Sequence, residues 1–380
     1  MAFFTQVYVD LEQGNDANDG SDLSPYLTIQ RAVNDFPVDG ALRINITGTV
    51  NDMAALDLDA AGTTSALSRP IMFSRWVGKP RPTLNFADAE MFQNDDSVDG
   101  MILSGINFTF QGEIPNNAFN INTGNTSTHN QWYDNMIDMD LVTANKEAIH
   151  TGQQGKAVGN VVLNANNGIR VYYGGFVANN FVSFKRYALM IQTTGYCMNN
   201  FMLALPSTDP QAAIYLQNHS STFVNNIAYD PTGEFQFVRG VSNKYGLGFI
   251  GNYAEGFLDG FVEGDALFHF LKNNTQVDIQ NNFVGMDPLW EDQNITGDEI
   301  LDGANPNDSF LILQNNGMID AIDMRKWFAV ITRDILDQSG LSKSIASIEA
   351  LSGVKFPTTA KPTVFGNESP AESVNPPYFN

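Results

Sequence analysis

Asn179-Asn180-Phe181-Val182 is one version of a motif that returns every 20 to 30 residues or so along the middle of the chain. Each version joins a turn residue to an asparagine and then to an apolar run. Self-similarity of this length is typical of a solenoid, in which every repeat forms one coil stacked on the previous coil. The other versions are Gly159-Asn160-Val161-Val162, Asn199-Asn200-Phe201-Met202, Asn225-Asn226-Ile227-Ala228, Gly251-Asn252-Tyr253-Ala254 and Asn281-Asn282-Phe283-Val284.

Asparagine suits such a turn because its short amide tolerates the left-handed backbone region and can form local hydrogen bonds. Amides that stack from coil to coil can also bond to one another in a column. A second apolar stretch precedes the asparagine pairs at a similar offset, as at 188–191 and 212–216. We therefore predict a structural ladder, with Asn107 as an earlier step, made of Asn135, Asn160, Asn180, Asn200, Asn226, Asn252 and Asn282.

The composition narrows the class of protein. The 380 residues carry a net charge of -22 with a pI near 4.3, which repels nucleic acid phosphates and anionic membrane surfaces. We therefore expect neither nucleic acid nor a membrane as a partner. The single cysteine, Cys197, excludes a disulfide framework and is expected to be a small buried hydrophobe. A solenoid grows by adding coils, so one long domain is the simpler expectation for this length.

The first residues, Met1-Ala2-Phe3-Phe4, lack the basic start and the long apolar run of a signal peptide. No stretch of the sequence is apolar for long enough to span a bilayer. We therefore expect a protein that is made in a cytoplasm without a signal peptide.

The N-terminal segment reads as a cap. Residues 6–10 are predicted to form a strand, 14–20 a turn-rich loop, and 25–33 a short helix that covers the open end of the first coil. Acidic residues crowd this loop, so calcium is an alternative to Asx turns. A calcium loop would need a ligand where Ala17 stands and a closing glutamate where Tyr26 stands. No other metal or cofactor is expected.

Together, Tyr8-Val9-Asp10, the loop 14–20 and Thr28-Ile29-Gln30 resemble the opening of right-handed parallel β-helix proteins of the pectate-lyase-like superfamily. Residues 41–46, 69–73, 82–86 and 98–110 resemble the strands of successive coils, and 281–290 resembles a closing segment. The resemblance implies an all-β, right-handed, single-stranded parallel β-helix over 1–295, with an N-terminal cap in about the first 40 residues.

Residues 296–380 lack the asparagine ladder and depart from the family. Their apolar spacing predicts two amphipathic helices, followed by a proline-rich extended arm from 355 to 380. We read this partly helical tail as a C-terminal cap or an assembly region. The candidate assembly residues are Trp327, Ile345 and Ile348.

Catalytic signals are scarce. A lyase acting on uronates would need clustered cations, whereas Arg170 is expected to project outward and Lys185-Arg186 to lie in a loop. Hydrolysis of a neutral polysaccharide needs two carboxylates. The candidates for them are Glu255, Asp259, Glu263 and Asp265. Acidic groups on so negative a chain are more often solvated, and His150 and His219 have no ligand-like neighbours.

Three functions stay open, of which the least specific is an ordinary bacterial β-helix protein, either cytoplasmic or exported without a signal peptide. A solenoid with few catalytic signals and an unusual tail resembles the β-helical tailspike, fibre and decoration proteins of tailed bacteriophages. That resemblance implies a non-enzymatic virion surface protein, homo-oligomeric and trimeric by family expectation, in contact with other virion proteins and with host-surface polysaccharide. The candidate glycan-binding residues are Trp132, Tyr133, Phe257 and Phe261. The alternative is a polysaccharide depolymerase, either a glycoside hydrolase or a lyase.

Overall fold

The structure is a computed structural model that describes residues 4–35, 40–58, 70–92, 100–115, 117–119, 129–142, 145–217, 221–224, 226–240, 244–250, 252–258, 266–272 and 275–277. The chain divides into two compact units, residues 1–176 and 177–380. The predicted boundary at 295, the predicted tail and the residues Asn282, Trp327, Ile345 and Ile348 lie outside the described residues.

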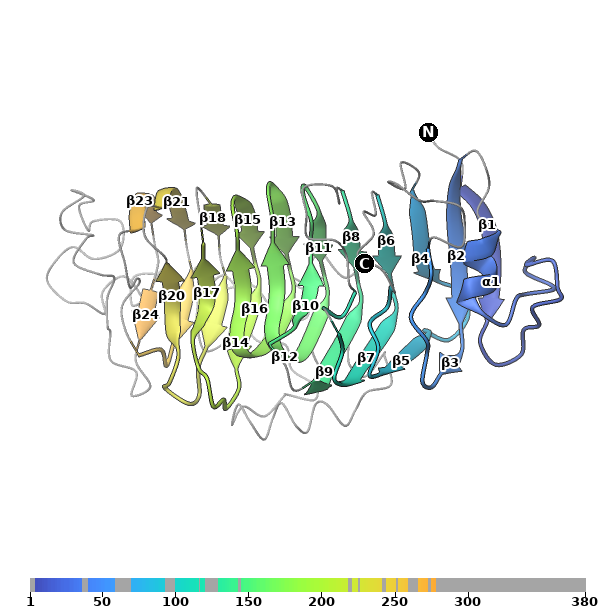
Figure 1. Cartoon of the computed structure of the whole chain (residues 1–380). Coiled ribbons are helices and arrows are strands. Elements are labelled where there is room, and N and C mark those ends of the chain that lie inside the picture. Colours follow the sequence, from blue (N-terminus) through green and yellow to red (C-terminus); the bar gives the residue numbers. More distant parts are fainter. Residues whose placement is uncertain are drawn as a thin grey trace, which may run out of the picture. The chain divides into compact units, whose positions relative to one another are not determined.

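Unit 1 consists of parallel strands in stacked coils (Figure 1). Its first sheet has the strand order β1 (Phe4–Asp10), β2 (Ala41–Thr47), β4 (Ile71–Arg75), β6 (Ile102–Ser104), β8 (Gln131–Tyr133) and β11 (Lys156–Val158). Its second sheet has the order β3 (Thr49–Val50), β5 (Thr83–Ala87), β7 (Asn107–Gly112), β9 (Met136–Val142) and β12 (Val161–Val171). The later half of β12 also pairs with β10 (Glu147–His150).

Unit 2 repeats the same plan, and the unit division falls within β13 (Gly175–Ala178). One sheet of unit 2 contains β15 (Gly195–Met198), β18 (Ser221–Val224), β21 (Lys244–Ile250) and β23 (Ala266–Lys272). The other contains β14 (Phe181–Ile191), β16 (Phe201–Ala204), β19 (Ile227–Tyr229), β22 (Tyr253–Glu255) and β24 (Thr275–Val277). The later half of β14 pairs with β17 (Ala212–Leu216), and β17 pairs with β20 (Gln236–Gly240). The predicted all-β parallel solenoid is confirmed.

The N-terminal helix is shorter than predicted. Helix α1 (Ile29–Asn34) begins after Thr28, whose hydroxyl accepts a hydrogen bond from the Arg31 N–H, and lies against β1 and β2 (Figure 1). The residues before it are extended, because Tyr26 bridges to Val9. In the acidic loop, Asp16 accepts hydrogen bonds from the Leu27 and Thr28 N–H groups at 2.9 Å, which fixes the entry to the helix.

The other polar residues of the acidic loop form the predicted Asx turns. Asp10 accepts hydrogen bonds from the backbone two and three residues ahead, while Asn15 and Asp19 each accept one from two residues ahead.

The core consists of side chains that stack from coil to coil. In unit 1, Phe86 and Phe110 stack with their ring centroids 4.9 Å apart, and in unit 2 Phe181 and Phe201 pack at 5.4 Å. Burial of each such ring contributes about 1.5 to 3 kcal/mol. Cys197 is fully buried, as expected, and this burial raises the pKa of its thiol.

The asparagines form the column that the repeats predict. In unit 2 the Asn200 amide donates to Asn226 Oδ1 at 2.9 Å, and the Asn226 amide donates to Asn252 Oδ1 at 2.9 Å. In unit 1 the Asn135 amide donates to Asn160 Oδ1 at 3.1 Å. Because all five are at least 99% buried, their amides supply hydrogen bonds where water cannot.

The residues before four of the ladder asparagines turn the chain. Asp134, Gly159, Asn179 and Asn199 all have positive φ, between 51° and 69°. The step assigned to Asn107 was wrong. The Ile106 N–H donates to Asn135 Oδ1, so an isoleucine after Gly105 (φ 72°) holds the ladder position in that coil, and Asn107 opens strand β7.

Candidate functional site

Three of the four predicted catalytic residues lie outside the part of the chain that the structure describes. Asp259, Glu263 and Asp265 lie outside the described residues, as does the aromatic candidate Phe261. Glu255 is the last residue of β22, and only its backbone is described. The carboxylate pair remains a prediction.

Two of the predicted glycan-binding aromatics are core residues. Trp132 and Phe257 are 0% and 1% exposed, so neither offers a ring face to a ligand, and their assignment is corrected. Along β8 the side chains alternate, which places Trp132 inward and its neighbours Gln131 and Tyr133 outward. Tyr133 is half-buried, and its hydroxyl bonds to Gln131 Oε1.

The strands β14, β17 and β20 of unit 2 bring together a group of aromatic and basic side chains. Parallel pairing aligns Tyr187 with Ala212, and Met190 with Tyr215 and then Arg239. The Tyr187 and Tyr215 rings stack with centroids 4.7 Å apart and an interplanar angle of 24°. We call this surface the β14–β17–β20 face; its residues are Arg186, Tyr187, Met190, Asp209, Gln211, Tyr215 and Arg239.

A polar network frames the stacked rings. Gln211 Oε1 accepts hydrogen bonds from the Tyr187 hydroxyl, at 3.4 Å, and from the Arg239 guanidinium, while the Gln211 amide donates to Asp209 at 2.6 Å. Arg186 lies over the Tyr187 ring, 5.1 Å from its centroid, and 3.0 Å from an Asp209 oxygen. These contacts hold planar polar groups beside an aromatic surface.

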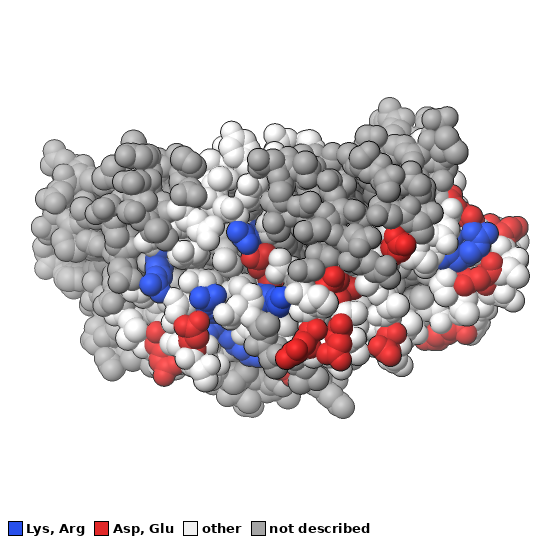
Figure 2. Space-filling model, in the orientation of Figure 1, with Lys and Arg blue, Asp and Glu red and all other residues white. Residues whose placement is uncertain are grey.

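The face is more basic than the chain as a whole. In Figure 2, basic side chains gather over the part of the molecule where Figure 1 places β14, β17 and β20, with acidic side chains below them. Lys185 and Arg186 belong to strand β14 and not to a loop, which corrects the prediction. They lie where β14 changes partner, from β16 through Phe184 to β17 from Tyr187 onward.

A second group of polar side chains lies on β10 and β12 of unit 1. Glu147 Oε1 and Arg170 Nη1 are 2.7 Å apart, with the carboxylate 7% and the guanidinium 21% exposed. Arg170 thus reaches an ion pair instead of projecting freely outward. Burial raises the pKa of Glu147 more than Arg170 lowers it. His150 pairs with Arg170 across the parallel strands β10 and β12 and is 3% exposed. Burial, together with the positive charge of Arg170, lowers the pKa of His150 to about 3.

The raised pKa of Glu147 predicts a pH-dependent effect of Glu147→Gln. The carboxyl of Glu147 ionises near pH 4.3 in the unfolded chain, whereas burial raises its pKa in the folded protein. As pH rises above about 4.3, ionisation therefore favours the unfolded state, and Glu147 lowers the free energy of unfolding. We expect Glu147→Gln to match the wild type near about pH 4 and to be more stable at neutral pH. Urea unfolding at both pH values measures this. A variant that is less stable at neutral pH, with no difference near pH 4, would show that the Arg170 pair outweighs burial.

Within the described part of the chain, no group of three or more His, Cys, Asp or Glu residues could hold a metal ion. No described helix is long and apolar enough to cross a membrane.

Comparison with known proteins identifies no family. No protein-family model matches the sequence, and no curated protein matches it. Among solved structures, a GH136 lacto-N-biosidase from Eubacterium ramulus is similar over 68% of this chain, at 13% identity and a TM-score of 0.42. A rhamnogalacturonan lyase is similar over 66% of this chain, at 17% identity and a TM-score of 0.30.

The chain spans 57% of the lacto-N-biosidase chain and 74% of the lyase chain. Both neighbours are carbohydrate-active enzymes by name, but matches this weak carry no inference about function. The resemblance to bacteriophage proteins stays a prediction.

Proposed function

We propose that this protein binds glycans and that the β14–β17–β20 face of unit 2 is the binding surface. The observation that carries the proposal is the stacked pair of Tyr187 and Tyr215 inside a network of planar polar side chains. A saccharide ring has apolar C–H faces and a rim of hydroxyls. An aromatic face bordered by amide and guanidinium groups complements both.

The two tyrosines have different parts in this surface. Tyr187 is 5% exposed and packs with Met190 and Ala212, so it supports the surface from below. Tyr215 is only partly buried, so it is the member of the pair that a ligand could contact. Because the Tyr187 hydroxyl and Arg239 both bond to Gln211, the network holds its side chains in place before a ligand arrives.

Loss of the Tyr215 ring is expected to weaken glycan binding about five- to tenfold, since one aromatic contact contributes roughly 1 to 1.4 kcal/mol. Tyr215→Ala is compared with the wild type on an array of neutral and acidic oligosaccharides, and the affinity for each bound glycan is then measured by titration. Tyr215→Phe keeps the ring and is expected to retain most of the binding.

Tyr196 offers a matched control, because it is 55% exposed on β15, in the other sheet of the same unit. Tyr196→Ala is expected to bind as the wild type does. A wild-type protein that binds nothing on the array, or a Tyr215→Ala variant that binds undiminished, overturns the proposal.

Two finer functions from the sequence remain proposals of lower rank. A virion surface role relies on the predicted assembly residues Trp327, Ile345 and Ile348. Polysaccharide degradation relies on the predicted carboxylates Glu255, Asp259, Glu263 and Asp265. Neither is supported by a contact among the described residues, whereas glycan binding is compatible with both.

A further inference from the structure

The sheet that contains β14, β16, β19 and β22 carries a row of apolar residues across unit 2. Strand register pairs Phe181 with Phe201, Phe201 with Ile227, and Ile227 with Tyr253. We call these four positions the outer apolar row. Side chains alternate along a strand, so the next residue of each strand points to the opposite side. Those next residues form the inward row and are all 0% exposed: Val182, Met202, Ala228 and Ala254.

The positions two residues further along these strands show which side is the outside. The register aligns Ser183 with Leu203, and then with Tyr229 and Glu255. Tyr229 is partly exposed, and a row that includes it and a glutamate faces away from the core. On the inward side, Phe184 is fully buried and packs against Phe235 with the ring centroids 5.3 Å apart. The outer apolar row therefore lies on the outside of the coils.

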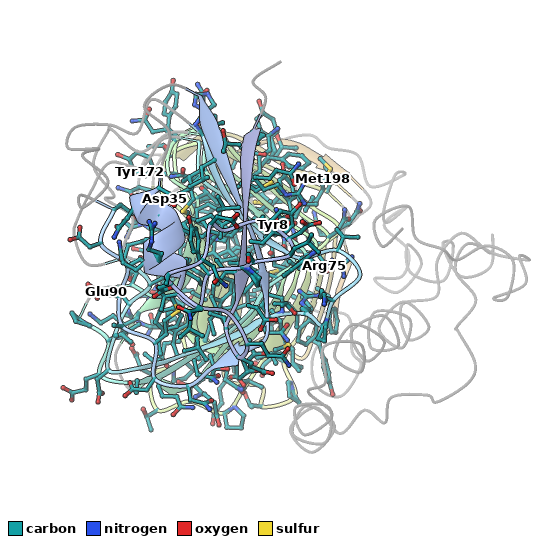
Figure 3. All side chains as sticks on the ribbon, turned by 90° about the vertical axis from the view of Figure 1, so that its right-hand side faces the viewer. Tyr8, Asp35, Arg75, Glu90, Tyr172 and Met198 are labelled. Carbon is teal, nitrogen blue, oxygen red and sulfur yellow. The ribbon has the colours of Figure 1, made fainter. Side chains whose placement is uncertain are left out.

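The outer apolar row is nevertheless covered. Phe181 and Phe201 are only 5% and 4% exposed. Outward residues of the other sheet in unit 2 differ, because Tyr196 on β15 is 55% exposed. Met198 on the same strand is partly exposed, and Figure 3 places it at the outer edge of the side chains. Outward aromatic rings as buried as Phe181 and Phe201 indicate that another layer packs on this side of the sheet.

The described parts of unit 2 do not supply this layer. They contain no helix, and their loops contact other surfaces. In the loop before β17, Asp209 pairs with Arg186 on the β14–β17–β20 face. The loop before β20 is closed by hydrogen bonds to Asp230, and its Phe235 enters the core. Because the row is buried within a single chain, we infer that its cover comes from another segment of the same chain.

Residues 341–351 match this surface in pattern and in length. They lie outside the described residues, and the sequence predicts an amphipathic helix there. Steps of four, three and three residues place its apolar side chains on one helix face. These side chains are Leu341, Ile345, Ile348 and Leu351. At 1.5 Å per residue they form a stripe about 15 Å long. The outer apolar row crosses three strand spacings of about 4.8 Å, or about 14 Å.

We propose that residues 341–351 dock as a helix along the outer apolar row of unit 2. The polar side of this helix, with Ser342, Lys343 and Glu349, then faces solvent. Residues 278–340 connect the last described strand to the segment, which is ample chain for the few strand spacings between β24 and β14. The proposal assigns the predicted assembly residues Ile345 and Ile348 to a contact within one chain, and it does not depend on glycan binding.

Thiol labelling of the full chain with a maleimide tests the proposal. Cys197 is the single native cysteine and is fully buried inside the coils, so its labelling reports unfolding of the coils. Phe201→Cys places a second thiol in the outer apolar row, and Tyr196→Cys places one on the exposed side of β15. We expect the thiol of Phe201→Cys to react at least about tenfold more slowly than that of Tyr196→Cys, because its reaction requires the cover to open.

Charges in the docked face are expected to remove this protection. Ile345→Asp together with Ile348→Asp is expected to speed the labelling of Phe201→Cys about tenfold or more, since the cover can no longer bury an apolar stripe. Ala346→Asp together with Ala350→Asp is the matched control. It adds the same charge on the opposite side of the predicted helix and is expected to leave the labelling rate unchanged, while Cys197 stays unreactive in both variants.

A disulfide test decides the case in which Ile345→Asp with Ile348→Asp unfolds the coils, which labelling of Cys197 would reveal. Phe201→Cys is combined in turn with a cysteine at each of the four stripe positions and, as controls, at positions 346 and 350. Under oxidation, at least one stripe position is expected to form a disulfide with Phe201→Cys within one chain, because the two side chains are then in contact. The two control positions are expected to form none.

Three results overturn the proposal. If Phe201→Cys labels as fast as Tyr196→Cys, the outer apolar row is uncovered in solution. If protection of Phe201→Cys survives the two aspartates at 345 and 348 while Cys197 stays unreactive, another segment supplies the cover. If no stripe position forms a disulfide, or if disulfides form only between two chains, residues 341–351 do not dock on their own coils. The last of these, with a dimeric mass, assigns the row to a second copy of the chain.

Discussion

Replacing Asn200 with alanine is expected to destabilise unit 2 by about 4 kcal/mol, since four buried side-chain hydrogen bonds are lost at about 1 kcal/mol each. Asn200 Nδ2 donates to the Val177 carbonyl at 3.1 Å and to Asn226 Oδ1 at 2.9 Å. Its Oδ1 accepts from the Asn180 N–H at 3.1 Å and from the Asn180 amide at 2.9 Å. Urea unfolding of the variant against the wild type measures the loss.

The preceding residue provides the control. Asn199 has a φ of 53°, which glycine adopts without strain, so Asn199→Gly is expected to change stability by less than about 1 kcal/mol. The two substitutions alter neighbouring asparagines of one turn, and only the first interrupts the column. Equal losses from both would mean that the turn, and not the ladder, stabilises this coil.

The ladder was predictable because its signal is local and repeated. A left-handed residue followed by a buried asparagine recurs at Asp134, Gly159, Asn179 and Asn199, and stacking then follows from the period. Asn107 was misassigned because it too precedes an apolar run, although the turn glycine stands two residues before it. The position of Gly105 carried the information, since it aligns with Asp134 and Gly159.

The candidate sites were not predictable residue by residue, because their members meet only through strand register. Tyr187 and Tyr215 are one coil apart in sequence, as are Glu147 and Arg170, and neither pair forms a motif. Aligning each coil on its ladder asparagine would not have placed Tyr215 beside Met190 and Arg239, because the spacing from the asparagine differs between coils. Met190 follows Asn180 by 10 residues, Tyr215 follows Asn200 by 15, and Arg239 follows Asn226 by 13. Trp132 was predicted to contact a ligand, which requires an exposed ring. Alternation along β8 instead turns its side chain into the core, where it is fully buried.

The burial of His150 predicts that unit 1 loses stability in acid. The folded pKa is about 3 and an unfolded histidine titrates near 6.5, so between these values the unfolded state binds one more proton. The buried, neutral His150 does not reduce the free energy of unfolding above about pH 6.5. Below that pH, the free energy of unfolding falls by about 1.4 kcal/mol for each pH unit. The loss from about pH 6.5 to pH 3.5 is on the order of 4 kcal/mol.

The neighbours of His150 set the sign of this effect. Burial comes first, and the Arg170 guanidinium across the ladder adds to it by repelling a second positive charge. Glu147 bonds to that guanidinium, and its own raised pKa opposes the trend, because its stability contribution grows as pH falls. The observed slope of the wild type is therefore the difference between two opposing titrations, and a variant is needed to separate them.

His150→Phe removes one of the two titrations and keeps a ring beside Tyr172. The variant loses stability at every pH through its missing bond to the Gly152 N–H, so the informative quantity is the slope and not the level. We expect the stability gap between wild type and variant to narrow steadily as pH falls below about 6.5. Urea unfolding at several pH values, with His129→Asn as an exposed control whose φ of 60° asparagine tolerates, measures this gap. A gap that is independent of pH would show that His150 titrates in the folded protein as it does in the unfolded chain, and that its burial does not lower its pKa.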